Sequence, residues 1–393
     1  MSAYTARLGA SLKKITPVNI ILGKALPFSI YDKNGILLLR QGKVIITPDQ
    51  IEHLVTRGDV THSTPLKEAG ADAQSHKPAP PSEDRQSSFE RINELTLNLK
   101  HVIDTTLKRP EQIDVTMRIG KIALEIQEIC KEDSDSAIAA PCFDLSNPCI
   151  TVHQMMGAVL TELIAHSKGL KQEQRLALVC AALTRDLGQI PIQSELDNHV
   201  GPLPDTLRAR IHQHPNLSAQ LLASAGVTDP LWLDAVRGHH ERLNGSGYPA
   251  ALKDDQVFLG SRILAVADTY SAMIQPRPYR KKTHFSQNAI KEIYQKQDTE
   301  IDGEIVRILI SRIGLLPPGA IVKLKCGEIA VIKSHTLKPE AAIVYTIFGK
   351  SGTLLSHPVR RDTSEPNYEI TGLVPYSECR AAAVIIKRVW TNF

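Results

Sequence analysis

The chain has 393 residues, of which 42% are hydrophobic and 22% are charged, and its formal net charge at pH 7 is +4. This length predicts two or three domains of an ordinary globular protein. So small a net charge gives no electrostatic argument for a nucleic acid polymer as partner, and the lack of any run of about 18 apolar residues excludes a predicted membrane span.

Residues 1–62 are predicted to form a small β-rich module. Two strands are expected at 27–31 and 35–39, on either side of the Asn34-Gly35 pair. This dipeptide is a strong hairpin signal, because both residues tolerate the positive φ angles of a tight turn.

Residues 63–87 are predicted to be a flexible linker, because they are polar, rich in Pro, Ala and Ser, and show no apolar pattern that could bury a core. A helical segment, 88–147, follows. Its first helix has apolar residues at mostly three- and four-residue steps, and a second helix of the same pattern is expected from about 112 to 130. The apolar face of the first helix comprises Ile92, Leu95, Leu99, Val102 and Ile103.

Residues 148–315 are predicted to form a helical domain, and residues 316–393 a C-terminal β-rich extension. The extension begins after a turn rich in Pro and Gly, and its apolar runs are short and β-branched. The whole chain is therefore expected to be mainly α, a helical bundle with small β-rich modules at both ends. Helices are expected around 155–164, 175–184, 216–225, 231–237, 260–274 and 303–313, and strands around 321–324, 329–332 and 342–345.

The six cysteines show neither a CxxC pair nor zinc-ribbon spacing. Such isolated cysteines favour free thiols in a reducing compartment. Residues 1–22 have no continuous apolar core and no small-residue cleavage site, so no secretory signal is expected. Together these features predict a cytoplasmic protein.

The segment 238–249 carries the densest chemical signal. His239, His240 and Glu241 run directly into a glycine-rich turn that Tyr248 and Pro249 close. Imidazole is the commonest metal-ligating side chain, and glycine lets the backbone approach a ligand closely. The segment therefore predicts a place where a metal ion and a substrate are held together.

Three charged residues interrupt otherwise apolar helices: Arg185, Asp186 and Asp268. A charge inside an apolar helix is costly unless it is paired or bound to a metal. These residues therefore predict one buried polar centre, which further histidines complete. The expected histidines are His153, His214, His239 and His240.

In these residues the chain resembles the HD-GYP family, a branch of the HD-domain metal-dependent phosphohydrolases, over roughly residues 150 to 290. Several motifs in a fixed order are far more specific than a single motif. The resemblance implies an all-helical domain with a two- or three-metal centre, usually of iron or manganese, that hydrolyses the bacterial second messenger cyclic di-GMP. The matching motifs are His153, Asp186-Leu187-Gly188, His214-Pro215, His239-His240-Glu241, Gly247-Tyr248-Pro249, Val266-Ala267-Asp268 and Arg277-Pro278-Tyr279-Arg280.

The resemblance also implies roles for individual residues. One metal position would use Asp186, His214, His239 and His240. The neighbouring position would use His153, Asp268, the histidine of the HD motif and, as a bridge, Asp186. Substrate contacts to guanine and phosphate are implied for the Gly-Tyr-Pro loop and the basic segment after it, namely Gly247, Tyr248, Arg277 and Arg280.

The chain departs from the family at the HD histidine, which is Arg185 here. A guanidinium has no lone pair to offer and does not lose its proton in proteins, so it cannot ligate a metal. Gln189 stands at the position where the family usually has a lysine that contacts phosphate. Cys149 stands where some members have a glutamate. We therefore expect Arg185 to pair with Asp268 or Asp186, and the chain to bind one divalent ion, iron or manganese.

Three functions remain open on these residues. The first is an active cyclic di-GMP phosphodiesterase with an altered centre, for which either a single metal or Arg185 as a phosphate clamp suffices. Asp186 and Arg185 are its catalytic candidates. The second is a catalytically inactive cyclic di-GMP receptor. The third is a scaffold that binds a protein partner through its Gly-Tyr-Pro loop. For single residues, Asp268 is either a metal ligand or an ion-pair partner, and Arg277 and Arg280 are either phosphate contacts or a solvated basic face.

Overall fold

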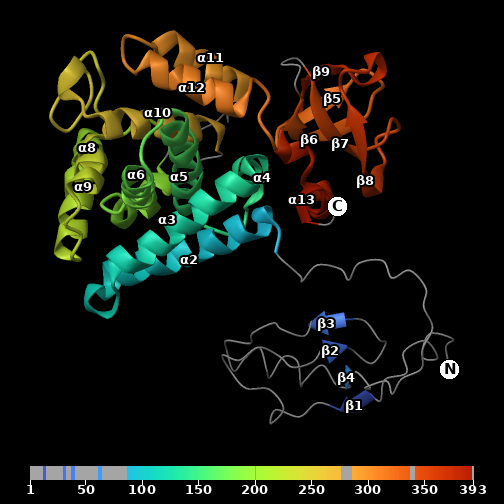
Figure 1. Cartoon of the computed structure of the whole chain (residues 1–393), viewed down its shortest axis with the longest axis horizontal. Helices are drawn as coiled ribbons and strands as arrows, with labels where there is room; N and C mark the ends of the chain where they lie inside the picture. Colours follow the sequence, from blue (N-terminus) through green and yellow to red (C-terminus); the bar gives the residue numbers. More distant parts are fainter. Residues whose placement is uncertain are drawn as a thin grey trace. The chain divides into compact units, whose positions relative to one another are not determined.

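The computed structural model describes most of the chain. The chain divides into two compact units, 1–81 and 82–393, and each is described by itself (Figure 1). In the second unit, helices form the larger part and a small sheet lies near the C-terminus. The residues described are 12–14, 30–31, 37–39, 61–63, 86–199, 201–275, 286–336 and 341–391.

The first unit contains a small antiparallel sheet in the order β1-β4-β2-β3. Strands β2 and β3 pair with each other, which confirms the predicted strand pair. The Asn34-Gly35 turn between them and the predicted linker, except its two ends, lie outside the described residues. The strands are β1 (Leu12–Lys14), β2 (Ile30–Tyr31), β3 (Leu37–Leu39) and β4 (Thr61–Ser63).

The second unit opens with the two predicted helices, α2 (Ser88–Lys108) and α3 (Val115–Glu132), followed by the short α4 (Ser134–Ala139). The predicted apolar faces are buried. Helix α3 begins three residues later than predicted, because the Asp114 side chain caps it by accepting a hydrogen bond from the Met117 backbone N–H.

The predicted helical domain is confirmed as helical, with α5 at its centre in contact with α3, α6, α10 and α12. Every predicted apolar stretch lies in a helix. Helices α7 and α11 were not predicted, since both are short and mostly polar on their outer face. The bounds are α5 (Cys149–Ser167), α6 (Gln172–Thr184), α7 (Gln193–Asn198), α8 (Asp205–Ser224), α9 (Pro230–Gly238), α10 (Leu259–Ile274), α11 (Ser286–Lys296) and α12 (Gly303–Ile313).

The C-terminal extension is an antiparallel sheet in the order β8-β7-β6-β5-β9, followed by helix α13 (Ala383–Thr391). The three predicted strands are present, whereas the helix was not predicted. The Trp390 ring stacks on Phe89 at a centroid distance of 5.3 Å, so the end of α13 packs against the start of α2. The strands are β5 (Ile321–Leu324), β6 (Ile329–His335), β7 (Ala342–Phe348), β8 (Leu354–Asp362) and β9 (Ile370–Leu373).

The fold is mainly α, as predicted. All six cysteines are free thiols. Among the helices within the described ranges, none combines the length and apolar character needed to cross a membrane. The domain boundaries drawn from the sequence at 147/148 and 315/316 stay predictions.

Candidate metal centre

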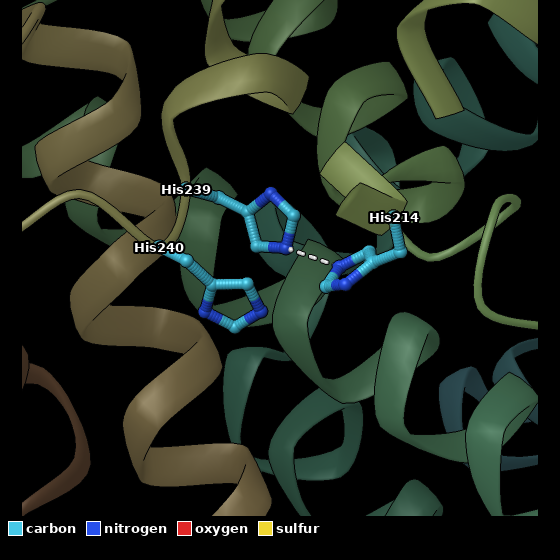
Figure 2. A group of neighbouring side chains, drawn as sticks. All are labelled: His214, His239 and His240. Atoms are coloured by element: carbon cyan, nitrogen blue, oxygen red, sulfur yellow. Dashed lines mark hydrogen bonds between the residues drawn. The ribbon is translucent and has the colours of Figure 1, made fainter. Parts of the chain in front are cut away.

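Three histidine rings meet where helix α8 approaches the end of helix α9. His214 lies on α8, and His239 and His240 directly follow α9 (Figure 2). One ring nitrogen from each lies within 4.8 Å of the others, and Nε2 of His214 is 3.2 Å from Nε2 of His239. Figure 2 shows the His214 and His239 rings turned toward each other, with His240 beside them.

Backbone carbonyls orient two of these rings. Nδ1 of His214 lies 2.6 Å from the Ile211 carbonyl oxygen, and Nδ1 of His239 lies 2.7 Å from that of Val236. A ring nitrogen that faces a carbonyl carries the proton, so the Nε2 lone pairs of both residues face the common point between the rings.

Burial keeps all three imidazoles neutral. Burial and, to a lesser extent, the nearby His214 ring lower the pKa of His239 to about 4. Burial also lowers the pKa of His214 and, more strongly, that of His240. Neutral imidazoles with converging lone pairs are suited to bind a cation.

Asp186 supplies an oxygen beside this cluster. It follows helix α6, and its Oδ1 lies 3.6 Å from Nε2 of His214. Its buried Oδ2 has no hydrogen-bond partner, although the Arg185 guanidinium lies 3.5 Å away. A buried carboxylate oxygen without a hydrogen bond is costly unless a cation binds it. Three imidazoles and one carboxylate therefore fit a divalent metal ion.

Arg185 lies inside the centre and is only 1% exposed. Its Nε donates to Oδ1 of Asp268 at 3.0 Å, and one terminal nitrogen donates to the Ala182 carbonyl at 2.5 Å. The other terminal nitrogen lies 3.5 Å from the His153 carbonyl. The predicted pairing of Arg185 with Asp268 is thus confirmed.

His153 and Asp268 belong to the same closed network. Nε2 of His153 lies 2.9 Å from Oδ1 of Asp268, and its Nδ1 lies 3.0 Å from the Ser271 hydroxyl. Burial opposes ionisation of Asp268, but Arg185 and His153 hold its pKa well below the ordinary value. Both ring nitrogens of His153 therefore already have protein neighbours.

Glu241 folds the Gly-Tyr-Pro loop back onto the centre. Its buried carboxylate accepts hydrogen bonds from the backbone N–H groups of Ala250 at 2.7 Å and Leu252 at 2.9 Å. A Cβ at Gly247 would lie 2.4 Å from the Arg242 backbone nitrogen, so this position admits only glycine without a rearrangement. The loop is thereby fixed close to His240.

Tyr248 lies among the histidines. Its ring stacks on His212 at a centroid distance of 4.2 Å and packs against His240 at 4.7 Å. His212 is not among the site residues predicted from the sequence. Its only signal was a position two residues before His214, and residues with that spacing do not share a helix face.

A cavity of about 200 Å³ opens beside the centre. Among the described residues that line it there is no lysine or arginine, and Arg185 lies behind its wall. This geometry argues against Arg185 as a phosphate clamp. Arg277 and Arg280 lie outside the described residues. The polar lining includes His153, Asp186, Gln189, Gln193, Asp197, His240, Tyr248 and Asp268.

Comparison with known proteins agrees with this centre. An HD domain family model matches residues 140–305. A cyclic di-GMP phosphodiesterase of Pseudomonas aeruginosa is 31% identical over 152 residues, which are 39% of this chain and 36% of that protein. A 3'3'-cGAMP-specific phosphodiesterase of Vibrio cholerae is 29% identical over 174 residues, which are 44% of this chain and 37% of that protein.

The chain thus spans little more than a third of the length of these two relatives. A solved structure, that of the HDG"Y"P protein Bd1817 from Bdellovibrio bacteriovorus, matches with a TM-score of 0.47 and 14% identity, covering 77% of this chain and 99% of that one. The matched HD domain contains every described residue of the centre, together with the Gly-Tyr-Pro loop. Over residues 140–305 the chain is thus similar to HD-domain proteins, among them curated phosphodiesterases of cyclic dinucleotides.

Proposed function

We propose that this chain is a cyclic di-GMP-binding HD-GYP protein whose phosphodiesterase activity is weak or absent. The observation that carries the proposal is the Arg185 guanidinium, which lies between Asp268 and Asp186 where a second metal ion would need to bind. The names of the relatives support a cyclic dinucleotide as ligand.

The metal in this proposal is a single iron or manganese ion, held by Asp186, His214, His239 and His240. The neutral rings and the unpartnered oxygen of Asp186 support this ligand set. A divalent ion lowers the pKa of a bound water and polarises phosphoryl oxygens. His153 and Asp268 serve to hold Arg185 in place.

The ligand in this proposal occupies the cavity beside the centre. Tyr248 lines this cavity. The resemblance to the HD-GYP family assigns contacts with the guanine and phosphates to Gly247, Arg277 and Arg280 as well. Gln189 lines the cavity and offers a neutral amide. An amide stabilises the negative charge that develops on phosphorus less well than a cation does. The dinucleotide is therefore bound more readily than it is hydrolysed.

The rate deficit follows from the same geometry. Each loss of about 1.4 kcal/mol of transition-state stabilisation lowers the rate tenfold. The chain lacks both a second ion and the cavity cation at position 189. We therefore expect hydrolysis to be slower, by several orders of magnitude, than at a centre with two metal ions and a lysine at position 189. A cytoplasmic location stays a prediction from the isolated cysteines.

Calorimetry and product chromatography with cyclic di-GMP test the proposal. We expect saturable binding, with little linear or mononucleotide product over hours. The double substitution of Arg185→His and Gln189→Lys should raise turnover while leaving binding largely intact. Fast turnover by the unaltered chain that disappears in His240→Ala would refute impaired catalysis, and absence of binding would refute the receptor role.

A further inference from the structure

Arg185 is among the largest fully buried side chains in the described part of the protein. Moving a charge out of water is expensive, and the cost is recovered only with good geometry and further hydrogen bonds. Arg185 has both, because Asp268, Asp186 and the Ala182 carbonyl surround its guanidinium. The side chain is therefore an integral part of the helical core.

Gly157 on helix α5 makes room for this side chain. A Cβ at position 157 would lie 2.7 Å from one terminal nitrogen of Arg185 and 3.1 Å from its Cζ. The guanidinium cannot swing aside, since the Ala182 carbonyl and Asp268 hold it within a closed core. Glycine inside a helix is normally destabilising relative to alanine, so this position has a specific reason to lack a side chain.

The charges of the centre balance around the guanidinium. The Arg185 side chain lies 3.0 Å from the Asp268 carboxylate and 3.5 Å from that of Asp186, so its one positive charge faces both. With Arg185 present, one net negative charge remains for a metal ion to neutralise. Without it, two buried carboxylates would repel each other.

We propose that Gly157 and Arg185 form a matched pair, in which a permanent cation replaces an exchangeable one, so that the His153–Asp268 half of the centre keeps its structure without metal. This inference rests on the proposed metal site at the three histidines, and it does not depend on cyclic di-GMP as the ligand. Its consequence is a cavity wall that is the same in metal-free and metal-loaded protein.

A double-mutant cycle tests the pairing through stability alone. Gly157→Ala should lower the thermal midpoint of the full chain in EDTA when residue 185 is arginine. The same substitution should have little effect, or raise the midpoint, in the Arg185→His background, because histidine is too short to reach the added methyl group. Gly120→Ala in α3, where a Cβ meets nothing within 4 Å, is the control and should behave alike in both backgrounds.

If Gly157→Ala lowers the midpoint equally in both backgrounds, the matched pair is refuted. Metal content supplies a second measurement. After equilibration with manganese and removal of free ions, the unaltered chain should retain one ion, whereas Arg185→His should retain two. Two ions in the unaltered chain would overturn the proposal.

Arg185→Met separates charge from size. It should lower the midpoint in EDTA, and manganese should restore much of the loss, since an added cation can again neutralise both carboxylates. Arg361→Met, which also removes an arginine from a carboxylate, should lose stability without rescue by manganese.

A midpoint of Arg185→Met in EDTA equal to that of the unaltered chain would contradict the inference. If Arg185→Met does not fold, the cycle with Gly157 still decides. Failure of cyclic di-GMP binding with all these outcomes intact would refute the proposed function alone.

Discussion

Nε2 of His214 and Nε2 of His239 face each other at 3.2 Å, although the two residues belong to different helices and each ring is tied to its own backbone by Nδ1. Two unprotonated nitrogens at this distance repel each other unless a proton or a cation lies between them. The fold therefore holds the rings ready for an ion, and the cost of orienting them is met when the chain folds.

Metal binding should stabilise the protein through this pair. A ligand that binds only the folded state adds about 2.7 kcal/mol at a concentration 100 times its Kd. Manganese should therefore raise the thermal midpoint of the unaltered chain, and His239→Ala should remove most of that rise. Differential scanning calorimetry with and without manganese measures it. His166→Ala, on the exposed end of α5, should keep the full rise.

Replacing Glu241 with glutamine should loosen the Gly-Tyr-Pro loop. The glutamine amide has one oxygen where the carboxylate has two, so one of the two backbone N–H groups, of Ala250 or Leu252, loses its acceptor. A buried donor without a partner costs about 1–3 kcal/mol. Urea unfolding should show a loss of this order, with faster hydrogen exchange at residues 250 and 252. Glu195→Gln, in an exposed pair with Arg210, should change neither quantity measurably.

The pair of Glu328 and Arg361 in the C-terminal sheet should give a pH-dependent contribution to stability. The hydrogen bond from Arg361 lowers the pKa of Glu328 below that of an unfolded glutamate, which is about 4.3. A lowered folded-state pKa stabilises the fold above the unfolded value, and this stabilisation is lost as the pH falls through the folded pKa.

The free energy of unfolding should therefore be higher in the unaltered chain than in Glu328→Gln at pH 7, by about 1–3 kcal/mol for a hydrogen bond to a charged group. The difference should shrink as the pH falls below about 4. A constant difference across this range would show that the charge of Glu328 does not contribute. Denaturant titrations at fixed pH values measure it.

Trp390→Ala should separate the C-terminal helix from the helical segment. The Trp390 side chain is 6% exposed, and its ring packs on Phe89 and Phe143. Truncating a buried aromatic residue costs about 3–5 kcal/mol. The loss should appear in chemical unfolding, with increased hydrogen exchange along α13. Val384→Ala in the same helix, at 65% exposure, should change stability by less than about 0.5 kcal/mol.

The sequence predicted the helices wherever apolar residues recur at helical spacing, because that spacing decides which face is buried. It did not predict α13, whose residues Val384, Ile385, Ile386 and Val389 are β-branched and typical of strands. Contacts distant in sequence override this preference: Ile385, Ile386 and Val389 are buried, whereas Val384 faces outward.

Part of the centre could be predicted, because a charged residue inside an apolar helix is energetically costly and therefore indicates a specific role. Asp186, Asp268 and Arg185 interrupt apolar helices, which indicated correctly that they lie together. Gly157 and His212 gave no comparable signal. A glycine in a helix and a histidine near a proline are individually ordinary, and their roles depend on neighbours that only the folded chain brings close.

The stack between Trp390 and Phe89 has a practical consequence for handling the protein. A version shortened before α13 would expose the Phe89 and Phe143 rings together. Such an exposed apolar patch favours association and precipitation of proteins. Expression trials should therefore retain residues 383–391, and an affinity tag at that end should be separated from Thr391 by a spacer long enough to leave the ring stack undisturbed.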